Sequence, residues 1–188
     1  TGAISYYDTD AVAISRIQSA GSVTLTAGGV ISTAASGSLG TGQVEANLLT
    51  VKTLNNSGAG VLLTAADNNV ATLNVSIRNA ADTARAGSSA GENTTTGAGG
   101  TVRYTDANGF AVAGISTGAS VVLSSGGAVT QTGAIMSDKL GLQGSGSFVL
   151  NQADVSSNPV NMVSVFASEA TGSVTFSSLT ALTIGTVN

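Results

Sequence analysis

The sequence predicts an all-β protein that folds as a parallel β-helix, a solenoid in which short strands stack coil on coil. Three observations predict this fold. The chain repeats a pattern of alternating apolar and polar residues, related segments recur 19 residues apart, and no stretch sustains the 3.6-residue apolar period of a helix. We therefore expect a single solenoid segment over residues 1–188.

The composition is unusual for a chain of 188 residues, a length that suffices for one well-cored domain. Charged residues make up 9% of the chain, against about 25% in typical soluble domains. The apolar fraction is nevertheless 42%, which is too high for a disordered chain. We therefore expect a folded protein whose surface is made mainly of hydroxyl and amide side chains.

The charged and reactive residues exclude several classes of function. The six basic residues are scattered along the chain, so no cationic patch for nucleic acid is predicted. No apolar run reaches the roughly 18–20 residues that cross a bilayer, so membrane insertion is not expected. The chain has no Cys and no His, which removes thiolate nucleophiles, the Ser-His-Asp triad and most transition-metal sites. No catalytic residue and no cofactor are predicted.

The first predicted element is a pair of short strands with a turn between them, within residues 2–17. Ile4 and Tyr6 lie two residues apart, and so do Val12 and Ile14, which is the alternation of a strand with one buried face. The gap between the two pairs holds Asp, Thr and Ala, which favours a turn. Two strands and a bend therefore fit this segment better than a helix.

The same pattern occurs twice more without a gap, at residues 100–115 and 172–187. The matching columns are Gly2, Gly100 and Gly172; Ile4, Val102 and Val174; Tyr6, Tyr104 and Phe176; Val12, Phe110 and Leu182; Ile14, Val112 and Ile184; and Ile17, Ile115 and Val187. Each copy is therefore expected to perform the same packing task at another level of the stack.

The next element is the segment GSVTLTAGGVI at residues 21–31, which returns as ASVVLSSGGAV at residues 119–129. Each of these segments ends its first strand with a glycine pair, Gly28-Gly29 and Gly126-Gly127. Because glycine adopts positive φ without steric cost, these pairs are predicted to be corners with that conformation.

The spacing between neighbouring strands predicts the length of a coil. Val23 follows Ile4 by 19 residues, and Val121 follows Val102 by the same 19. About twenty residues per coil is a plausible turn of a parallel β-helix. Each inward Val, Ile or Leu would then lie above a similar side chain of the next coil, and β-branched side chains suit such stacks.

The remaining similarities divide the chain into repeat units. Residues 60–67 resemble 147–154, and residues 68–73 resemble 158–163. The repeat units are therefore 2–99, 100–171 and a partial unit 172–188. Most of the length difference falls at about 79–100, a polar and Gly-rich insert that is predicted to form a surface loop and a local contact surface.

The ends of an open solenoid expose unpaired strand edges. Natural solenoids cover such edges with polar caps, yet this chain starts and stops within its repeat pattern. Two explanations stay open: a slice of a longer array, or a subunit whose ends stack into an extracellular filament. The expected partners are thus neighbouring coils of the same polypeptide or like subunits end to end.

The phrases SVTLTAGGVI, VVLSSGGAVTQTGAI, LTVKTLNNSGAGVLLTAADNNVATL and ALTIGTV resemble the shaft repeats of filamentous-haemagglutinin-like exoproteins. These are large bacterial adhesins exported by two-partner secretion. The resemblance covers most of the chain, with residues 79–100 as the main departure. It implies a right-handed parallel β-helix that forms a rod on the bacterial surface or in the secreted medium, and a receptor or glycan on a host or cell surface as a partner.

Asp8-Thr-Asp10 is the one candidate metal site in the sequence. Two carboxylates two residues apart can share a hard cation such as calcium. Aspartate is also a common turn former, and the corresponding residues of the later copies lose the charge, so turn formation is the favoured interpretation.

Glycoside cleavage would need two carboxylates about 5–10 Å apart. Neighbouring coils could bring Asp67 close to Asp154 or Asp106, but Asp67 and Asp154 occupy equivalent turns, which favours a structural role. A sugar-stacking ladder of Tyr6, Tyr104 and Phe176 is a further alternative, although their phase predicts packing inside the coil or at its corners.

These observations predict a non-catalytic structural segment of a secreted or cell-surface bacterial adhesin, a stiff rod that presents receptor-binding parts elsewhere. A self-assembling extracellular filament subunit and a polysaccharide-acting β-helix enzyme are the alternatives. End-to-end polymerisation would favour the first alternative, and a cleft with several convergent carboxylates the second.

Overall fold

In the computed structural model, residues 2–35, 42–83, 99–157 and 160–186 are described. These residues form seventeen strands and no helix. Every strand pairing among them is parallel, and fifteen of the strands belong to one sheet that curls round an axis. The predicted all-β parallel β-helix is confirmed.

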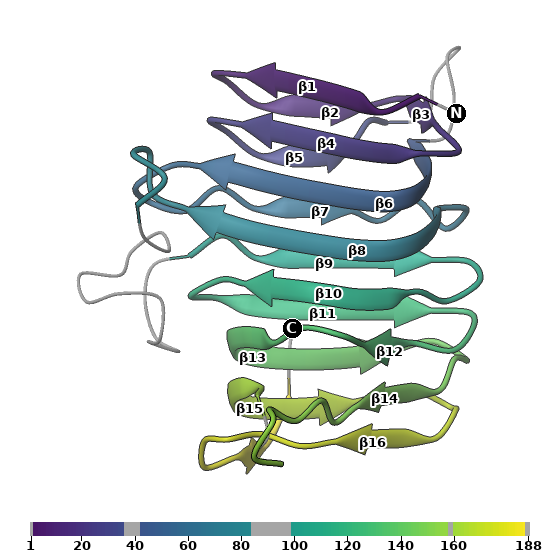
Figure 1. The fold of residues 1–188 in the computed structure, drawn as a ribbon, viewed down its shortest axis with the longest axis vertical. Coiled ribbons are helices and arrows are strands. Elements are labelled where there is room, and N and C mark those ends of the chain that lie inside the picture. Colours follow the sequence, from purple (N-terminus) through teal and green to yellow (C-terminus); the bar gives the residue numbers. More distant parts are fainter. Residues whose placement is uncertain (1, 36–41, 84–98, 158–159, 187–188) are drawn as a thin grey trace.

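The strands form two rows on opposite sides of the coil axis (Figure 1). The first row contains β1 (Ile4–Asp8), β4 (Ser22–Ala27), β6 (Gln43–Leu54), β8 (Asn69–Arg78) and β10 (Ala111–Ser116). The second row contains β2 (Val12–Ile14), β5 (Ile31–Thr33), β7 (Val61–Leu63), β9 (Val102–Asp106), β11 (Ser120–Ser125) and β13 (Ile135–Gln143). The long strand β13 joins the rows because it pairs with both β10 and β11.

The remaining strands complete the stack. They are β3 (Arg16–Gln18), β12 (Thr130–Gln131), β14 (Phe148–Leu150), β15 (Met162–Ser168), β16 (Val174–Phe176) and β17 (Thr183–Ile184). Strand β3 pairs with β6, β12 with β10, β15 with β13 and β17, and β14 with β16.

The coil is right-handed. In Figure 1 the near strands run towards the left and the far strands towards the right while the chain descends from β1 to β16. Seen from above, the chain therefore turns clockwise as it moves away from the viewer. This is also the hand of nearly all crossovers between parallel strands of one sheet.

Two continuous stacks of side chains fill the interior. Stack one contains Ile4, Val23, Leu49, Leu73, Val112, Gln131, Leu150 and Phe176. Its step from Gln131 to Leu150 continues the register of the parallel bridge between Val129 and Phe148. Stack two contains Val12, Ile31, Val61, Val102, Val121, Leu140, Phe166 and Ile184. Each stack runs from the first coil to the last, and Gln131 is the single polar member of either.

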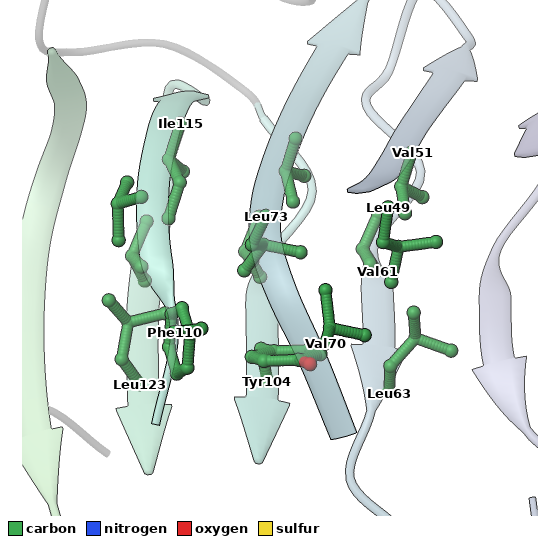
Figure 2. Close-up of a cluster of buried hydrophobic side chains, with 14 of the residues drawn as sticks. Leu49, Val51, Val61, Leu63, Val70, Leu73, Tyr104, Phe110, Ile115 and Leu123 are labelled. Carbon is green, nitrogen blue, oxygen red and sulfur yellow. The ribbon is translucent and has the colours of Figure 1, made fainter. Parts of the chain in front are cut away.

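The middle members of these stacks are fully buried, and Figure 2 shows how aliphatic side chains from both rows meet in the interior. Leu49 and Leu73 of the first row, and Val61 and Val102 of the second, are at most 1% exposed. Burial of one such side chain stabilises the fold by about 1.5–3 kcal/mol. Because every coil contributes similar residues, the stabilisation is spread along the axis.

The predicted coil length is confirmed where the repeat is tightest. Ile4 pairs with Val23, and Val102 pairs with Val121, each 19 residues later. Other coils are longer, since Val102 pairs with Val61, 41 residues earlier. The predicted insert at about 79–100 lies within that coil, and its residues 84–98 lie outside the described residues.

The first two of the matching sequence copies do not occupy equivalent places. Ile4 belongs to β1 in the first row, whereas its counterpart Val102 belongs to β9 in the second row. The two copies are therefore offset by half a coil. Both rows alternate inward and outward residues in the same way, so one sequence pattern suits either row.

The prediction of positive φ at the glycine pairs is wrong. Among the described glycines, those with positive φ are Gly42, Gly58, Gly109 and Gly144, and neither Gly28-Gly29 nor Gly126-Gly127 is among them. A Cβ at Gly28 would instead overlap the carbonyl of Thr9 in the preceding coil, and one at Gly127 would overlap that of Asn108. Glycine is needed at these pairs because the backbones of successive corners lie in direct contact, which leaves no room for a side chain.

Candidate functional site

The most elaborate polar site is built on the segment Tyr104-Thr105-Asp106 at the end of β9. The Tyr104 hydroxyl donates a hydrogen bond of 2.7 Å to Oδ2 of Asp106. The backbone N–H of Val70, in the preceding coil, donates to the same oxygen at 3.0 Å. The N–H groups of Asn108 and Gly109 donate to Oδ1 at 2.9 and 3.0 Å. Asp106 therefore ties its own turn to the coil above.

Burial makes this site a fixed structural anchor. Tyr104 and Asp106 are each 1% exposed. Burial, together with the adjacent carboxylate of Asp106, raises the pKa of the Tyr104 hydroxyl. The tyrosine thus keeps its proton and remains a hydrogen-bond donor. All the contacts of Asp106 are internal, which suits a buried, fully bonded carboxylate.

The segment Tyr6-Tyr7-Asp8 repeats this construction at the first coil. The Tyr6 hydroxyl donates to Oδ2 of Asp8 at 2.9 Å, and the N–H of Asp10 donates to Oδ1 at 2.9 Å. The N–H of Asp10 holds the pKa of Asp8 below its usual value, with the Tyr6 hydroxyl as the second cause. Tyr6 is 46% exposed, in contrast to Tyr104. The difference arises because no described strand lies above β1.

This geometry accounts for Asp8 and Asp10, the candidate calcium residues. The bond from the Asp10 N–H to the Asp8 carboxylate closes a two-residue turn, as expected for an aspartate turn. Within the described part of the chain, no group of three or more acidic, His or Cys side chains gathers to hold a metal ion. The geometry thus assigns Asp8 a turn-forming role.

The three carboxylates considered for glycoside cleavage lie in different surroundings. Asp106 is buried and fully engaged, whereas Asp67 and Asp154 lie in exposed turns. Asp154 accepts a 2.8 Å hydrogen bond from the N–H of Ser156. This contact of Asp154 is that of an aspartate turn.

The aromatic column does not form one ladder on the surface. Tyr104 is buried and packs edge-to-face on Phe110, with ring centroids 5.0 Å apart. Phe176 stacks on Phe166 at 4.7 Å. Tyr6 alone of the column is well exposed. A continuous sugar-stacking surface from these three residues is therefore ruled out by the burial of Tyr104.

Two buried asparagines at corners were missed by the sequence reasoning. Asn68 accepts the N–H of Val44 at 2.7 Å and donates to the carbonyl of Thr105 at 2.9 Å, so it connects three successive coils. Asn161 donates to the carbonyls of Leu150 and Ser177 at 2.9 and 3.0 Å. Both stand two residues before an inward valine, in the shared pattern Asn-x-Val, and that pattern was the available signal.

The two ends of the solenoid each carry an apolar groove. The groove at the first coil has a volume of about 370 Å³ and is lined chiefly by Ile4, Tyr6, Val12, Ile14, Ile17 and Leu25. The groove at the last coil has a volume of about 410 Å³, and Phe166 and Ile184 contribute its apolar surface.

Comparison of the chain with protein families, curated proteins and solved structures found no match. Among the described residues, no helix is long and apolar enough to span a membrane.

Proposed function

We propose that this chain is a non-catalytic structural segment of a secreted or cell-surface bacterial adhesin, in which it forms a stiff rod. The observation that carries the proposal is the pair of side-chain stacks that run unbroken from Ile4 to Phe176 and from Val12 to Ile184. A solenoid with such an interior gains length by adding coils, because each coil contacts only its neighbours.

The hydrogen bonds supply stiffness along the axis. In a parallel β-helix the backbone ladder joins one coil to the next, so a pull along the axis loads many parallel bonds together. Asn68 and Asp106 add side-chain bonds between coils at the corners. Because these side chains are buried, water does not compete for their bonds.

The outward surface suits a mechanical role. Thr24, Thr50 and Asn74 are successive outward residues in the first row. Short hydroxyl and amide side chains keep this face soluble without a strong charge field. The insert at about 79–100 is the segment we propose for contact with a receptor or glycan, since it alone departs from the repeat.

Placement outside the bacterium rests on the resemblance of the repeats to adhesin shafts. The lack of Cys and the low charge agree with such a rod but do not by themselves choose a compartment. Antibodies against this chain should label intact source cells or their medium, and external protease should remove the cell-bound label. A signal found only after lysis would contradict this placement.

Single-molecule force spectroscopy tests whether the chain resists extension as a rod should. The chain is held near residues 2 and 186 and stretched along its axis. We expect stepwise extension as coils peel off at forces well above those that extend an unfolded polypeptide, and an Asp106→Ala chain should yield at lower force. Extension without resistance would refute a load-bearing role.

A further inference from the structure

We propose that Met136 and Met162 form an oxidation site on the outward face of the first row of strands. At this site a peroxide converts Met136 to its sulfoxide, and the Ser116 hydroxyl donates a hydrogen bond to the new oxygen. These are the only two methionines of a chain that has no Cys. All the sulfur chemistry of this protein therefore belongs to this pair.

The strand register places the two methionines next to each other. Met136, near the start of β13, pairs with Met162, the first residue of β15. Paired strands lie about 4.8 Å apart, and paired residues point to the same face. Ile135 and Ser137 on either side of Met136 are 0% exposed, so Met136 itself points outward, where it is half-buried. Both thioethers are thus within reach of a small oxidant in the solvent.

The residue that precedes Met136 in the same outward column carries an unpaired hydroxyl. Ser116 of β10 pairs with Met136. Its hydroxyl oxygen is buried and has no hydrogen-bond partner among the described residues, which costs the folded protein stability. The two neighbours of Ser116 in this column are Ser76 and Met136, and the methionine is the longer. We therefore assign the cover of this hydroxyl to Met136, whose sulfur is only a weak acceptor.

Oxidation supplies the acceptor that this hydroxyl lacks. A lone pair on the Met136 sulfur attacks one oxygen of hydrogen peroxide, and the O–O bond breaks. The other oxygen takes up the displaced proton and leaves as water, so the thioether is oxidised to a sulfoxide and the peroxide is reduced. The sulfoxide oxygen is a strong acceptor on the side chain that adjoins the Ser116 hydroxyl.

The sulfoxide should be accommodated by the fold at this position. A methionine sulfoxide usually disrupts packing, because an apolar side chain becomes polar. On the outward face of β13 the polar group meets water on one side and an unsatisfied donor on the other. Strands β10, β13 and β15 therefore stay paired while the chain consumes the peroxide, and a methionine sulfoxide reductase can restore the thioether.

Peroxide treatment followed by peptide mass spectrometry tests whether the site reacts. In a Met162→Leu chain, which keeps an apolar side chain of similar volume, Met136 is the only sulfur. We expect Met136 to be oxidised in the folded chain and to be restored by the reductase. If Met136 stays unmodified while free methionine in the same solution is oxidised, the oxidation site is refuted.

Replacing Ser116 tests the hydrogen bond to the sulfoxide. Urea unfolding is compared before and after oxidation, in the Met162→Leu background. In the reduced chain, Ser116→Ala removes an unsatisfied hydroxyl and should leave the equilibrium constant for unfolding unchanged or lower it. In the oxidised chain the same change removes a donor to the sulfoxide and should raise that constant about fivefold. A serine with a purely structural role would not change its effect with oxidation.

Ser137→Ala is the matched control. The Ser137 hydroxyl is also buried without a partner among the described residues, but it points into the interior, where Ser137 pairs with the buried Val163. Its removal should change the unfolding constants of the reduced and oxidised chains by the same factor. The proposal is overturned if Ser116→Ala behaves like Ser137→Ala, or if oxidation of Met136 unfolds a chain that retains Ser116.

Discussion

At the scale of single residues, burial decides the role of a repeated group. Asp8 and Asp106 each follow a tyrosine by two residues and each accept that tyrosine's hydroxyl. Only Asp106 is enclosed by a coil on both sides, and only there are all its hydrogen bonds protected from water. One sequence motif thus forms an internal anchor in one coil and an exposed turn in another.

Replacing Asp106 with Ala should destabilise the protein strongly. The change leaves the Tyr104 hydroxyl and the N–H groups of Val70, Asn108 and Gly109 without their acceptor. Unsatisfied buried groups cost about 1–3 kcal/mol each, so we expect a loss of about 3 kcal/mol or more in the free energy of unfolding. Urea denaturation measures it. Asp8→Ala is the matched control and should have a much smaller effect; equal losses would contradict the role of burial.

Replacing Gly28 with Ala tests the close approach of corners. The added methyl would overlap the Thr9 carbonyl of the preceding coil, and the backbone must move to admit it. Overpacking of this kind costs about 1–3 kcal/mol. The melting temperature should fall accordingly, whereas Gly2→Ala, where nothing lies within 4 Å, should leave it unchanged. A neutral Gly28→Ala would show that this corner has room.

At the scale of elements, the ends of long strands are held by ionic contacts. Asp82 follows β8 and accepts a 2.7 Å bond from Nζ of Lys52 in β6 and a 3.0 Å bond from Nε of Arg78. These bonds, with that from Lys52 the strongest, hold the pKa of Asp82 below its usual value of 3.8. The carboxylate therefore links β6 to the C-terminal end of β8.

This ion pair should make a small, pH-dependent contribution to stability. A lowered pKa in the folded state means that the stabilisation is complete above the unfolded pKa and is lost as the pH falls through the folded one. Because the pair is partly exposed, Asp82→Asn should cost only about 0.5–1 kcal/mol at pH 7. Asn also tolerates the positive φ of 54° at this position.

The measurement compares denaturant unfolding of the wild type and Asp82→Asn from pH 7 to pH 2. The difference between them should vanish below the folded pKa of Asp82. A difference that persists unchanged at pH 2 would mean that the side chain contributes through something other than its charge.

At the scale of the whole molecule, stability should fall towards both ends. Inner strands such as β6 and β8 have a neighbour on either side, whereas β1 and β17 each have one neighbour among the described strands. In a solenoid whose coils contact only their neighbours, the end coils open first. Hydrogen exchange followed by mass spectrometry should therefore show faster exchange in β1 and β17 than in β6 and β8, at concentrations where the chain is monomeric. Uniform protection would contradict this arrangement.

The sequence predicted the architecture because the architecture is local. The sequence itself shows the alternation at Ile4 and Tyr6, the turn residues after them and the 19-residue spacing to Val23. Together these features predict strands stacked in parallel coils. The turn role of Asp8 could also be inferred, since an aspartate turn involves only residues close in sequence.

The remaining features depend on which residues lie in the coil above. The sequence alone could not show that Ile4 and Val102 stand in opposite rows, because both rows use the same alternation. Nor could it show that Gly28 avoids a clash, or that Asn68 joins three coils, because these contacts cross long stretches of chain. The sequence by itself determined that this protein coils; only the tertiary structure decided which groups each coil covers, because burial is set by neighbours distant in sequence.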